Sequence, residues 1–261
     1  MKFTNSDGLE IAYDDIGSAD LKPVVLVHGF SSNRAEGWKR TGWYAALQSR
    51  RERLIALDLR GHGESTRSHD PADYGHARMS NDIVELMDHL GVGCASLVSF
   101  SLGARLALGA AIDHPDRFDH LVLGGAGMRL FDPPRDIGMM ADAMTADDPE
   151  TIENPLLRSF RHFADEQGED RLALAACTRG EGRAFSPDDL FAVSTPTLVC
   201  AGARDLLAGS PEGLAEAIRG AHAVSLPGCD HFGAITHALL KGKVFDFLDG
   251  WLDVEEPPGF R

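Results

Sequence analysis

One serine lies where a nucleophile could be presented, in the segment Ser99-Phe100-Ser101-Leu102-Gly103. An apolar run precedes it and an Ala- and Leu-rich stretch follows, so Ser101 is expected at a turn between a strand and a helix. A serine at such a sharp turn projects clear of the sheet if the residues two before and two after it are small. Gly103 meets this requirement fully, and Ser99 stands where a glycine is expected. The alternative is an ordinary serine in a strand-to-helix turn.

Two backbone N–H groups could stabilise negative charge beside this serine. The helix expected to begin at Leu102 supplies a free N–H group and the positive end of its dipole. The apolar run Val24–Val27 ends at His28-Gly29-Phe30, where the glycine lets the chain turn so that the Phe30 N–H faces the same point. Two donors fixed before reaction are each worth about a hundredfold to a thousandfold in rate. We therefore expect an oxyanion hole at Phe30 and Leu102, with His28 as a structural histidine.

A serine is a weak nucleophile without a base, and the base needs an orienting carboxylate. His222 begins an apolar run and His237 falls on the last amphipathic stretch, whereas His231 lies in a loop after a strand. Asp205 follows another strand candidate, and its rival Asp230 is expected to point elsewhere because it precedes the base. The chain thus offers serine, aspartate and histidine in that order, each on a loop after a strand, where open α/β sheets bind ligands.

Other polar residues have two interpretations each. Arg60 and His62 lie in the segment Asp58–Ser65 and could contact a ligand, but we expect a turn held by its own hydrogen bonds. Three arginines further along could grip a substrate carboxylate: Arg129, Arg158 and Arg161. The alternative for these arginines is a solvated helix face.

The elements that would position these residues follow a simple alternation. Short apolar runs without polar alternation predict strands that are buried on both faces. These runs are Val24–Val27, Leu54–Leu57, Ala95–Val98, Leu121–Leu123, Thr197–Cys200 and Ala223–Leu226. Near the start, Asp7-Gly8 separates strand candidates at Lys2–Asn5 and Glu10–Asp15, which predicts a hairpin. We expect an α/β fold with a mostly parallel eight-stranded sheet, an N-terminal antiparallel hairpin and helices on both faces.

Amphipathic stretches between the strands predict helices at Met79–Leu90, Leu102–Ile112 and Ile235–Trp251, the first of them stopped by Gly91. From about residue 128 to 191 no convincing buried strand occurs, and Pro133-Pro134 stands at the entrance. A connection of that length is too long for a plain loop. We expect a helical cap inserted at residues 128–191, with the core domain formed by residues 1–127 and 192–261.

The composition excludes several classes of protein. The net charge of −15 and the scattered basic residues argue against a nucleic-acid partner, because such binding needs clustered Lys and Arg. No apolar run approaches the roughly 20 residues that cross a bilayer, and the first residues lack the apolar region of a secretory signal. We therefore expect a cytoplasmic protein with no membrane partner. The four cysteines are widely spaced and no H-E-x-x-H pattern occurs, so no metal site is expected.

The motifs occur in order along nearly the whole chain: His28-Gly29-Phe30, Asp58–Ser65, the turn around Ser101, Asp205 and His231. As a set they resemble the α/β-hydrolase superfamily, in particular its cap-bearing bacterial esterases and enol-lactonases. The resemblance implies a triad with Ser101 as nucleophile, His231 as base and then acid, and Asp205 as orienting carboxylate. It also implies cleavage of a small-molecule carboxylic ester or lactone through an acyl-enzyme on Ser101, without a cofactor. A serine rather than an aspartate at the turn argues against haloalkane dehalogenase or epoxide hydrolase chemistry.

Two alternatives remain at this stage. Cofactor-free C–C bond hydrolases and perhydrolases use the same triad, and a non-catalytic binder could keep the fold. The expected substrate contacts are Phe100, Arg129, Phe163 and Phe232.

Overall fold

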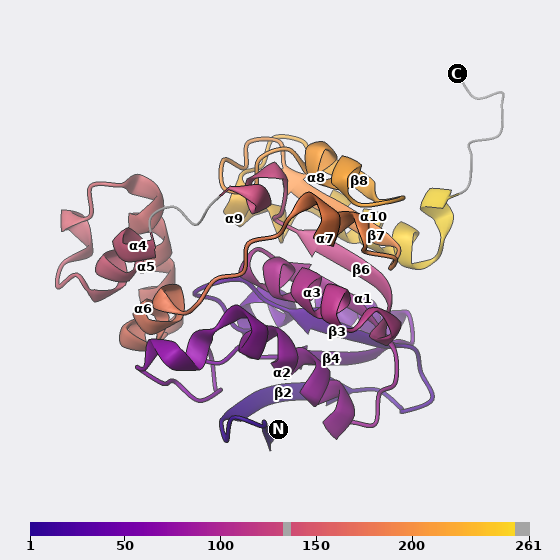
Figure 1. Cartoon of the computed structure of the whole chain (residues 1–261), viewed down its shortest axis with the longest axis horizontal. Coiled ribbons are helices and arrows are strands. Elements are labelled where there is room, and N and C mark those ends of the chain that lie inside the picture. Colours follow the sequence, from indigo (N-terminus) through magenta and orange to yellow (C-terminus); the bar gives the residue numbers. More distant parts are fainter. Residues whose placement is uncertain (133–136, 254–261) are drawn as a thin grey trace.

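A single eight-stranded sheet runs through the part of the chain that this computed structural model describes, residues 1–132 and 137–253 (Figure 1). The strands are β1 (Lys2–Thr4), β2 (Glu10–Ile16), β3 (Pro23–Val27), β4 (Arg53–Leu57), β5 (Ala95–Phe100), β6 (Phe118–Gly124), β7 (Thr197–Gly202) and β8 (His222–Leu226). Their order across the sheet is β1-β2-β4-β3-β5-β6-β7-β8. The pairs β1–β2 and β2–β4 are antiparallel and all others are parallel, so the predicted sheet and N-terminal hairpin are confirmed.

Helices cover both faces of this sheet. They are α1 (Trp43–Ser49), α2 (His76–His89), α3 (Leu102–Asp113), α4 (Ile137–Thr145), α5 (Pro155–Gln167), α6 (Arg171–Arg179), α7 (Pro187–Phe191), α8 (Pro211–Ala217), α9 (His231–Ala234) and α10 (Ala238–Leu248). Short helical segments of π or 3-10 type are η1 (Ala35–Lys39), η2 (Pro71–Tyr74), η3 (Pro115–Arg117), η4 (Met128–Phe131), η5 (Pro149–Thr151) and η6 (Trp251–Asp253). No helix within the described ranges is long and apolar enough to cross a membrane.

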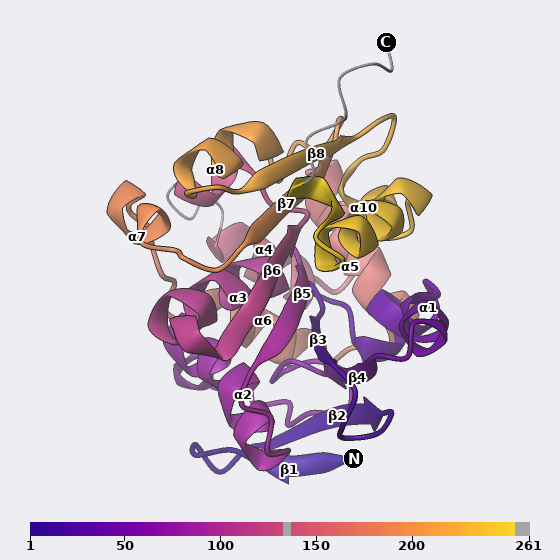
Figure 2. The same ribbon diagram turned by 90° about the vertical axis from the view of Figure 1, so that its right-hand side faces the viewer.

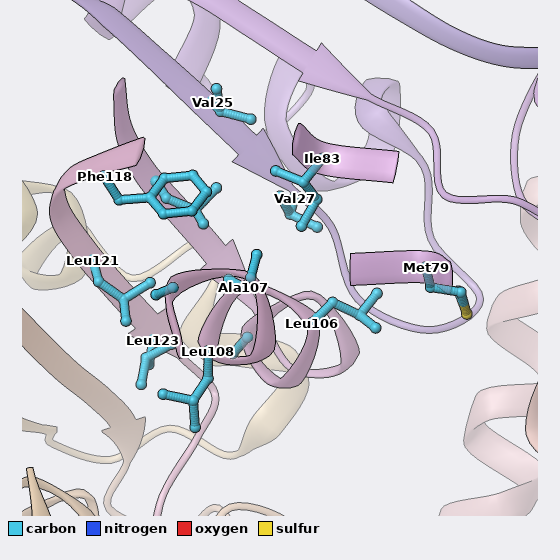
Figure 3. Packing of buried hydrophobic residues seen from close by; sticks show 14 of the residues in the cluster. Val25, Val27, Met79, Ile83, Leu106, Ala107, Leu108, Phe118, Leu121 and Leu123 are labelled. Atoms are coloured by element: carbon cyan, nitrogen blue, oxygen red, sulfur yellow. The ribbon is translucent and has the colours of Figure 1, made fainter. Parts of the chain in front are cut away.

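The core lies in two layers, one on each side of the sheet. Because side chains alternate along a strand, Val25 and Val27 of β3 pack on the side of α2 and α3, whereas Val24 and Leu26 pack on the side of α1 and α10 (Figure 2). Figure 3 shows the first layer, where Val27 lies between the strands and the side chains of α2 and α3. Burial on both faces explains why the strand sequences are continuous apolar runs.

The C-terminal stretch differs from the single helix predicted over Ile235–Trp251. It forms α9, α10 and η6, and two side chains cap the helices. The Asp230 side chain accepts a hydrogen bond from the Gly233 N–H and begins α9, so His231 is the first residue of a short helix and not a loop residue. His237 precedes α10, where its Nδ1 accepts from the Leu239 N–H. Apolar spacing cannot reveal such breaks, because they depend on side-chain acceptors for free helical N–H groups.

Between β6 and β7 the chain forms η4, α4, η5, α5, α6 and α7. In Figure 1, α4, α5 and α6 form a group to one side of the sheet. Helix α7 lies against α8, and its Leu190 joins the core layer of α2 and α3. Residues 128–191 therefore stay our proposed insertion, with α4–α6 as its protruding part and α7 docked on the core. The predicted entrance at Pro133-Pro134 lies outside the described residues.

Candidate active site

Ser101 lies between β5 and α3 in a conformation that residues other than glycine rarely adopt, with φ 56° and ψ −116°. Such a strained turn aims the hydroxyl away from the sheet. Gly103 is required here, because a Cβ atom on it would lie 2.4 Å from the Val27 carbonyl oxygen. Ser99 is accommodated in place of a glycine because its hydroxyl donates to the Val122 carbonyl at 2.5 Å.

The three side chains singled out from the sequence meet in one hydrogen-bonded chain. His231 Nε2 lies 2.9 Å from Ser101 Oγ, and His231 Nδ1 lies 2.7 Å from Asp205 Oδ2. The other oxygen of Asp205, Oδ1, accepts the N–H groups of Leu207 and Ala208, each at 2.9 Å. Asp205 and His231 are both buried, while Ser101 is half-buried. The carboxylate is thus held by the backbone on one side and aims at the imidazole on the other.

The parallel strands explain this meeting. β5, β7 and β8 run in one direction, so their carboxyl ends meet at one edge of the sheet, and the three residues follow those ends. The rivals lie elsewhere: Asp230 caps α9, His237 caps α10, and His222 begins β8.

The loop after β3 packs directly against the turn that carries Ser101. A Cβ atom on Gly29 would lie 3.1 Å from the Ser101 Cβ, a contact so tight that a larger residue would require the Ser101 turn to shift. Among the hydrogen bonds of residues 1–132 and 137–253, none gives the Phe30 or Leu102 N–H a protein acceptor. This proximity and these two free donors agree with the predicted oxyanion hole.

His28 is structural, as predicted. Its Nδ1–H donates to the Gly29 carbonyl at 2.8 Å, and its Nε2 accepts from the Leu59 N–H at 3.0 Å. Burial, reinforced by the neighbouring His62, lowers the His28 pKa to about 3. The neutral ring therefore links the loop after β3 to the loop after β4.

The loop Asp58–Ser65 is held by hydrogen bonds, also as predicted. Asp58 accepts from the N–H groups of Arg34 and Glu64. The buried Arg60 guanidinium binds the carboxylate of Asp82 through two nitrogens, at 2.7 and 2.8 Å. These contacts give Arg60 a structural role.

Five phenylalanines, called here the aromatic cluster, are joined to the His231 ring either directly or through one another by ring contacts: Phe30, Phe100, Phe160, Phe163 and Phe232. The His231 ring centroid lies 5.3 Å from Phe100, 6.0 Å from Phe232 and 6.4 Å from Phe160. Phe163 lies one contact further out, 6.2 Å from Phe232. Phe160 belongs to α5 and was not predicted at the site, because its spacing shows a buried helix face but not what that face covers.

The three arginines have different environments, and only Arg161 departs from both predictions. Arg161 is buried, and it donates to the carbonyls of Ala143 and Ala146 and pairs with Asp165. It therefore holds the insertion together, and both its expected roles are wrong. Arg158 donates to the Ile152 carbonyl within the same insertion, at 3.4 Å. Arg129 is exposed on η4, and none of the ring contacts among the described residues involves it.

Comparison with known proteins gives this geometry a family. A family model described as the alpha/beta hydrolase fold matches residues 22–176, more than half of the chain. The chain belongs to the α/β-hydrolase fold family. The matched residues contain the loop after β3, the turn at Ser101 and most of the insertion.

Curated relatives of this α/β hydrolase differ in how much of their length is matched. A protein of Variovorax paradoxus, named provisionally as the carbamate hydrolase RutD, is 28% identical over 92% of this chain and 96% of its own. A Bacillus subtilis protein, named provisionally as 2-succinyl-6-hydroxy-2,4-cyclohexadiene-1-carboxylate synthase, is 32% identical over 47% of this chain and 43% of its own. This chain thus spans less than half the length of the second relative.

Solved structures match over nearly the whole chain. A hydrolase from Pseudomonas aeruginosa is 27% identical with a TM-score of 0.77, covering 95% of this chain and 97% of that one. The enol-lactonase from Burkholderia xenovorans is 25% identical with a TM-score of 0.72, covering 95% of this chain and 100% of that one. The predicted superfamily is confirmed, and the neighbours include the predicted enol-lactonase type.

Proposed function

We propose that this hydrolase cleaves a carboxylic ester or lactone of a small apolar molecule through an acyl-enzyme on Ser101. The observation that carries the proposal is the hydrogen-bonded chain from Asp205 through His231 to the Ser101 hydroxyl. Because the Asp205 carboxylate faces Nδ1, that nitrogen carries the proton and Nε2 is free to accept one. His231 is therefore in the tautomer that a general base requires.

The reaction then proceeds in two steps. Ser101 Oγ attacks the carbonyl carbon as His231 Nε2 takes the hydroxyl proton, and the N–H groups of Phe30 and Leu102 stabilise the oxyanion. The alcohol leaves with the proton from His231, which forms the acyl-enzyme. Water, deprotonated by His231, attacks the acyl carbon, and Ser101 leaves with that proton as the acid is released. Every proton is moved by His231, so these steps need only protein groups and water.

The aromatic cluster supports an apolar substrate. Phe160 and Phe232 lie 5.0 Å apart between ring centroids, and both lie within ring contact of His231. Rings at this position favour a substrate that presents aryl or alkyl groups.

A carbamate is a second candidate substrate, because the relative that matches over 96% of its length is named provisionally as a carbamate hydrolase. Ser101 would attack the carbonyl carbon of a carbamate in the same way and would then carry a carbamoyl group. Esters, lactones and carbamates therefore belong in one test.

The test is a panel of p-nitrophenyl esters of rising acyl length, run beside lactones, carbamates and a dienoate that reports C–C cleavage. We expect ester turnover by the wild type and a loss of about 10⁴-fold or more in kcat for Ser101→Ala. The thermal midpoint of Ser101→Ala should stay close to the wild-type value. Full ester hydrolysis by Ser101→Ala would overturn the proposal, and turnover of the dienoate alone would favour C–C bond hydrolysis.

A further inference from the structure

Glu169 is a buried carboxylate that joins the insertion to the core. It follows Gly168, which ends α5, and precedes Asp170, which caps α6. Its Oε1 accepts from the Asn33 side-chain amide at 2.9 Å, and its Oε2 accepts from the Gly63 N–H at 2.9 Å. Burial raises the pKa of this carboxyl, although the hydrogen bonds from Asn33 and Gly63 oppose the shift. The insertion thus places one acceptor group between two loops of the core.

A second buried carboxylate binds the same two loops one residue further along. Asp58 Oδ1 accepts from the Arg34 N–H at 2.7 Å, and its Oδ2 accepts from the Glu64 N–H at 2.8 Å. Asp58 belongs to the core, whereas Glu169 arrives only with the insertion. Burying a carboxylate costs stability unless its oxygens are well bonded, so apolar packing would be the cheaper way to dock a helix pair. Glu169 instead ties the insertion to these two loops through hydrogen bonds.

The loop that Glu169 binds carries the Phe30 N–H. We call residues 28–34 the oxyanion loop. On one side of Phe30, His28 accepts from the Leu59 N–H, and on the other side Asn33 donates to Glu169. Ser31, between them, has φ 55°, a left-handed conformation that a serine adopts only when its surroundings enforce it. The direction of the Phe30 N–H thus depends on both attachments.

We propose that Glu169 is a positioning residue: through Asn33 and Gly63 it holds the oxyanion loop so that the Phe30 N–H faces the oxyanion. This inference rests on the proposed function. If Glu169 acts in this way, the oxyanion hole is complete only while the insertion is docked on the core. Because the hole acts on the transition state more than on the bound ester, losing Glu169 lowers kcat and leaves KM nearly unchanged.

The test compares Glu169→Ala with His69→Ala. His69 Nε2 lies 3.0 Å from Asp170 Oδ2, so it also joins the insertion to the core, next to Glu169 but away from the oxyanion loop. For Glu169→Ala we expect kcat to fall about tenfold to a hundredfold, with KM changed less than twofold. A trifluoromethyl ketone, whose adduct carries an oxyanion, should lose affinity by a similar factor. His69→Ala should keep the wild-type kcat and inhibitor affinity.

A double variant checks the route. If Glu169 acts through Asn33, the kcat of the double variant Glu169→Ala/Asn33→Ala should be no lower than the kcat of the more damaging single variant. Equal changes in Glu169→Ala and His69→Ala, or an unchanged kcat, would overturn the inference. Should Glu169→Ala fail to fold, Glu169→Gln, which keeps one acceptor oxygen, and Asn33→Ala are judged by the same criteria. If the wild type cleaves no ester and does not bind the trifluoromethyl ketone, the proposed function is wrong, and this inference is wrong with it.

Discussion

Asp205 shows how individual hydrogen bonds select the chemistry of the site. Its Oδ1 is occupied by the N–H groups of Leu207 and Ala208, so only Oδ2 faces the imidazole. In the proposed mechanism, this fixed carboxylate selects the tautomer of His231 that carries its proton on Nδ1. The free Nε2 then faces the Ser101 hydroxyl. The two nitrogens of His231 thus face the two groups that the proposed reaction requires, the carboxylate and the hydroxyl.

Asp205→Asn tests this selection. The amide oxygen can keep the Leu207 and Ala208 bonds, which turns the amide NH₂ toward His231 and favours the tautomer with the proton on Nε2. His231 then cannot accept the serine proton, and we expect kcat/KM for esters to fall about 10⁴-fold at neutral pH. Steady-state kinetics beside a thermal melt measures this. A loss below tenfold in a folded protein would show that the carboxylate does not orient the base.

At this scale the sequence could indicate the three polar residues and most of the aromatic cluster, but not Phe160, Arg161 or Glu169. Ser101, Asp205 and His231 could be chosen because each follows an apolar run and their order along the chain is restrictive. Arg161 could not be placed, because a buried arginine that binds backbone carbonyls has the same helical spacing as a solvated one. Glu169 gave no signal either, since its role comes from the docking of distant loops.

Helix α5 is the element that brings the insertion to the site. Its buried face carries Phe160, which contacts Phe30 and Phe232 as well as His231. The N-terminal side of α5 is fixed by Asn154, whose side chain accepts from the first free N–H groups. The helix thus places one aromatic ring over the oxyanion loop and the base together.

Phe160→Ala should change which esters are cleaved. Removing a ring that contacts the substrate costs about 1–3 kcal/mol of discrimination, so we expect kcat/KM for aryl and long-chain esters to fall about tenfold to a hundredfold. The acetate ester should change less than threefold. For the comparison variant Phe163→Ala we expect a smaller loss, because its ring reaches Phe232 but not His231. An equal loss for all acyl lengths would indicate that Phe160 does not contact the substrate.

The strands could be predicted to within three residues of their ends, whereas the division of the C-terminal stretch and of the insertion into separate helices could not. Burial on both faces leaves a continuous apolar run, which is a direct signature of a central parallel strand. The helix breaks at Asp230 and His237 depend on local caps. The arrangement of α4–α6 over the site depends on tertiary contacts, which periodicity does not contain.

At the scale of the whole molecule, the oxyanion loop contains one buried, neutral histidine, His28, and packs against a second, His62. Burial is the main cause in both, and it lowers the pKa of His28 to about 3 and that of His62 to about 4. His62 Nε2 has no hydrogen-bond partner in the described part of the chain, so a proton there would lack an acceptor. Both rings therefore stay neutral in the folded protein at pH values where the unfolded chain binds protons.

This difference predicts acid sensitivity. Between the unfolded pKa, near 6.5, and these lowered values, the unfolded state binds more protons, so the free energy of unfolding falls as pH falls. Each histidine contributes a loss of about 2 kcal/mol at pH 5. Urea unfolding at pH 7 and pH 5 measures it, and His62→Gln should show a smaller drop than the wild type. If the free energy of unfolding falls equally in the two proteins between pH 7 and pH 5, His62 does not contribute to the acid sensitivity.

The proposed nucleophile is tested most directly by covalent labelling. The wild type is incubated with a fluorophosphonate at neutral pH, and the adduct is located by intact mass and peptide mapping. We predict one adduct per chain, on the hydroxyl of Ser101, and none on Ser101→Ala. An unlabelled wild type, or an adduct on another residue with Ser101 unmodified, would contradict the catalytic role assigned to the Asp205–His231–Ser101 chain.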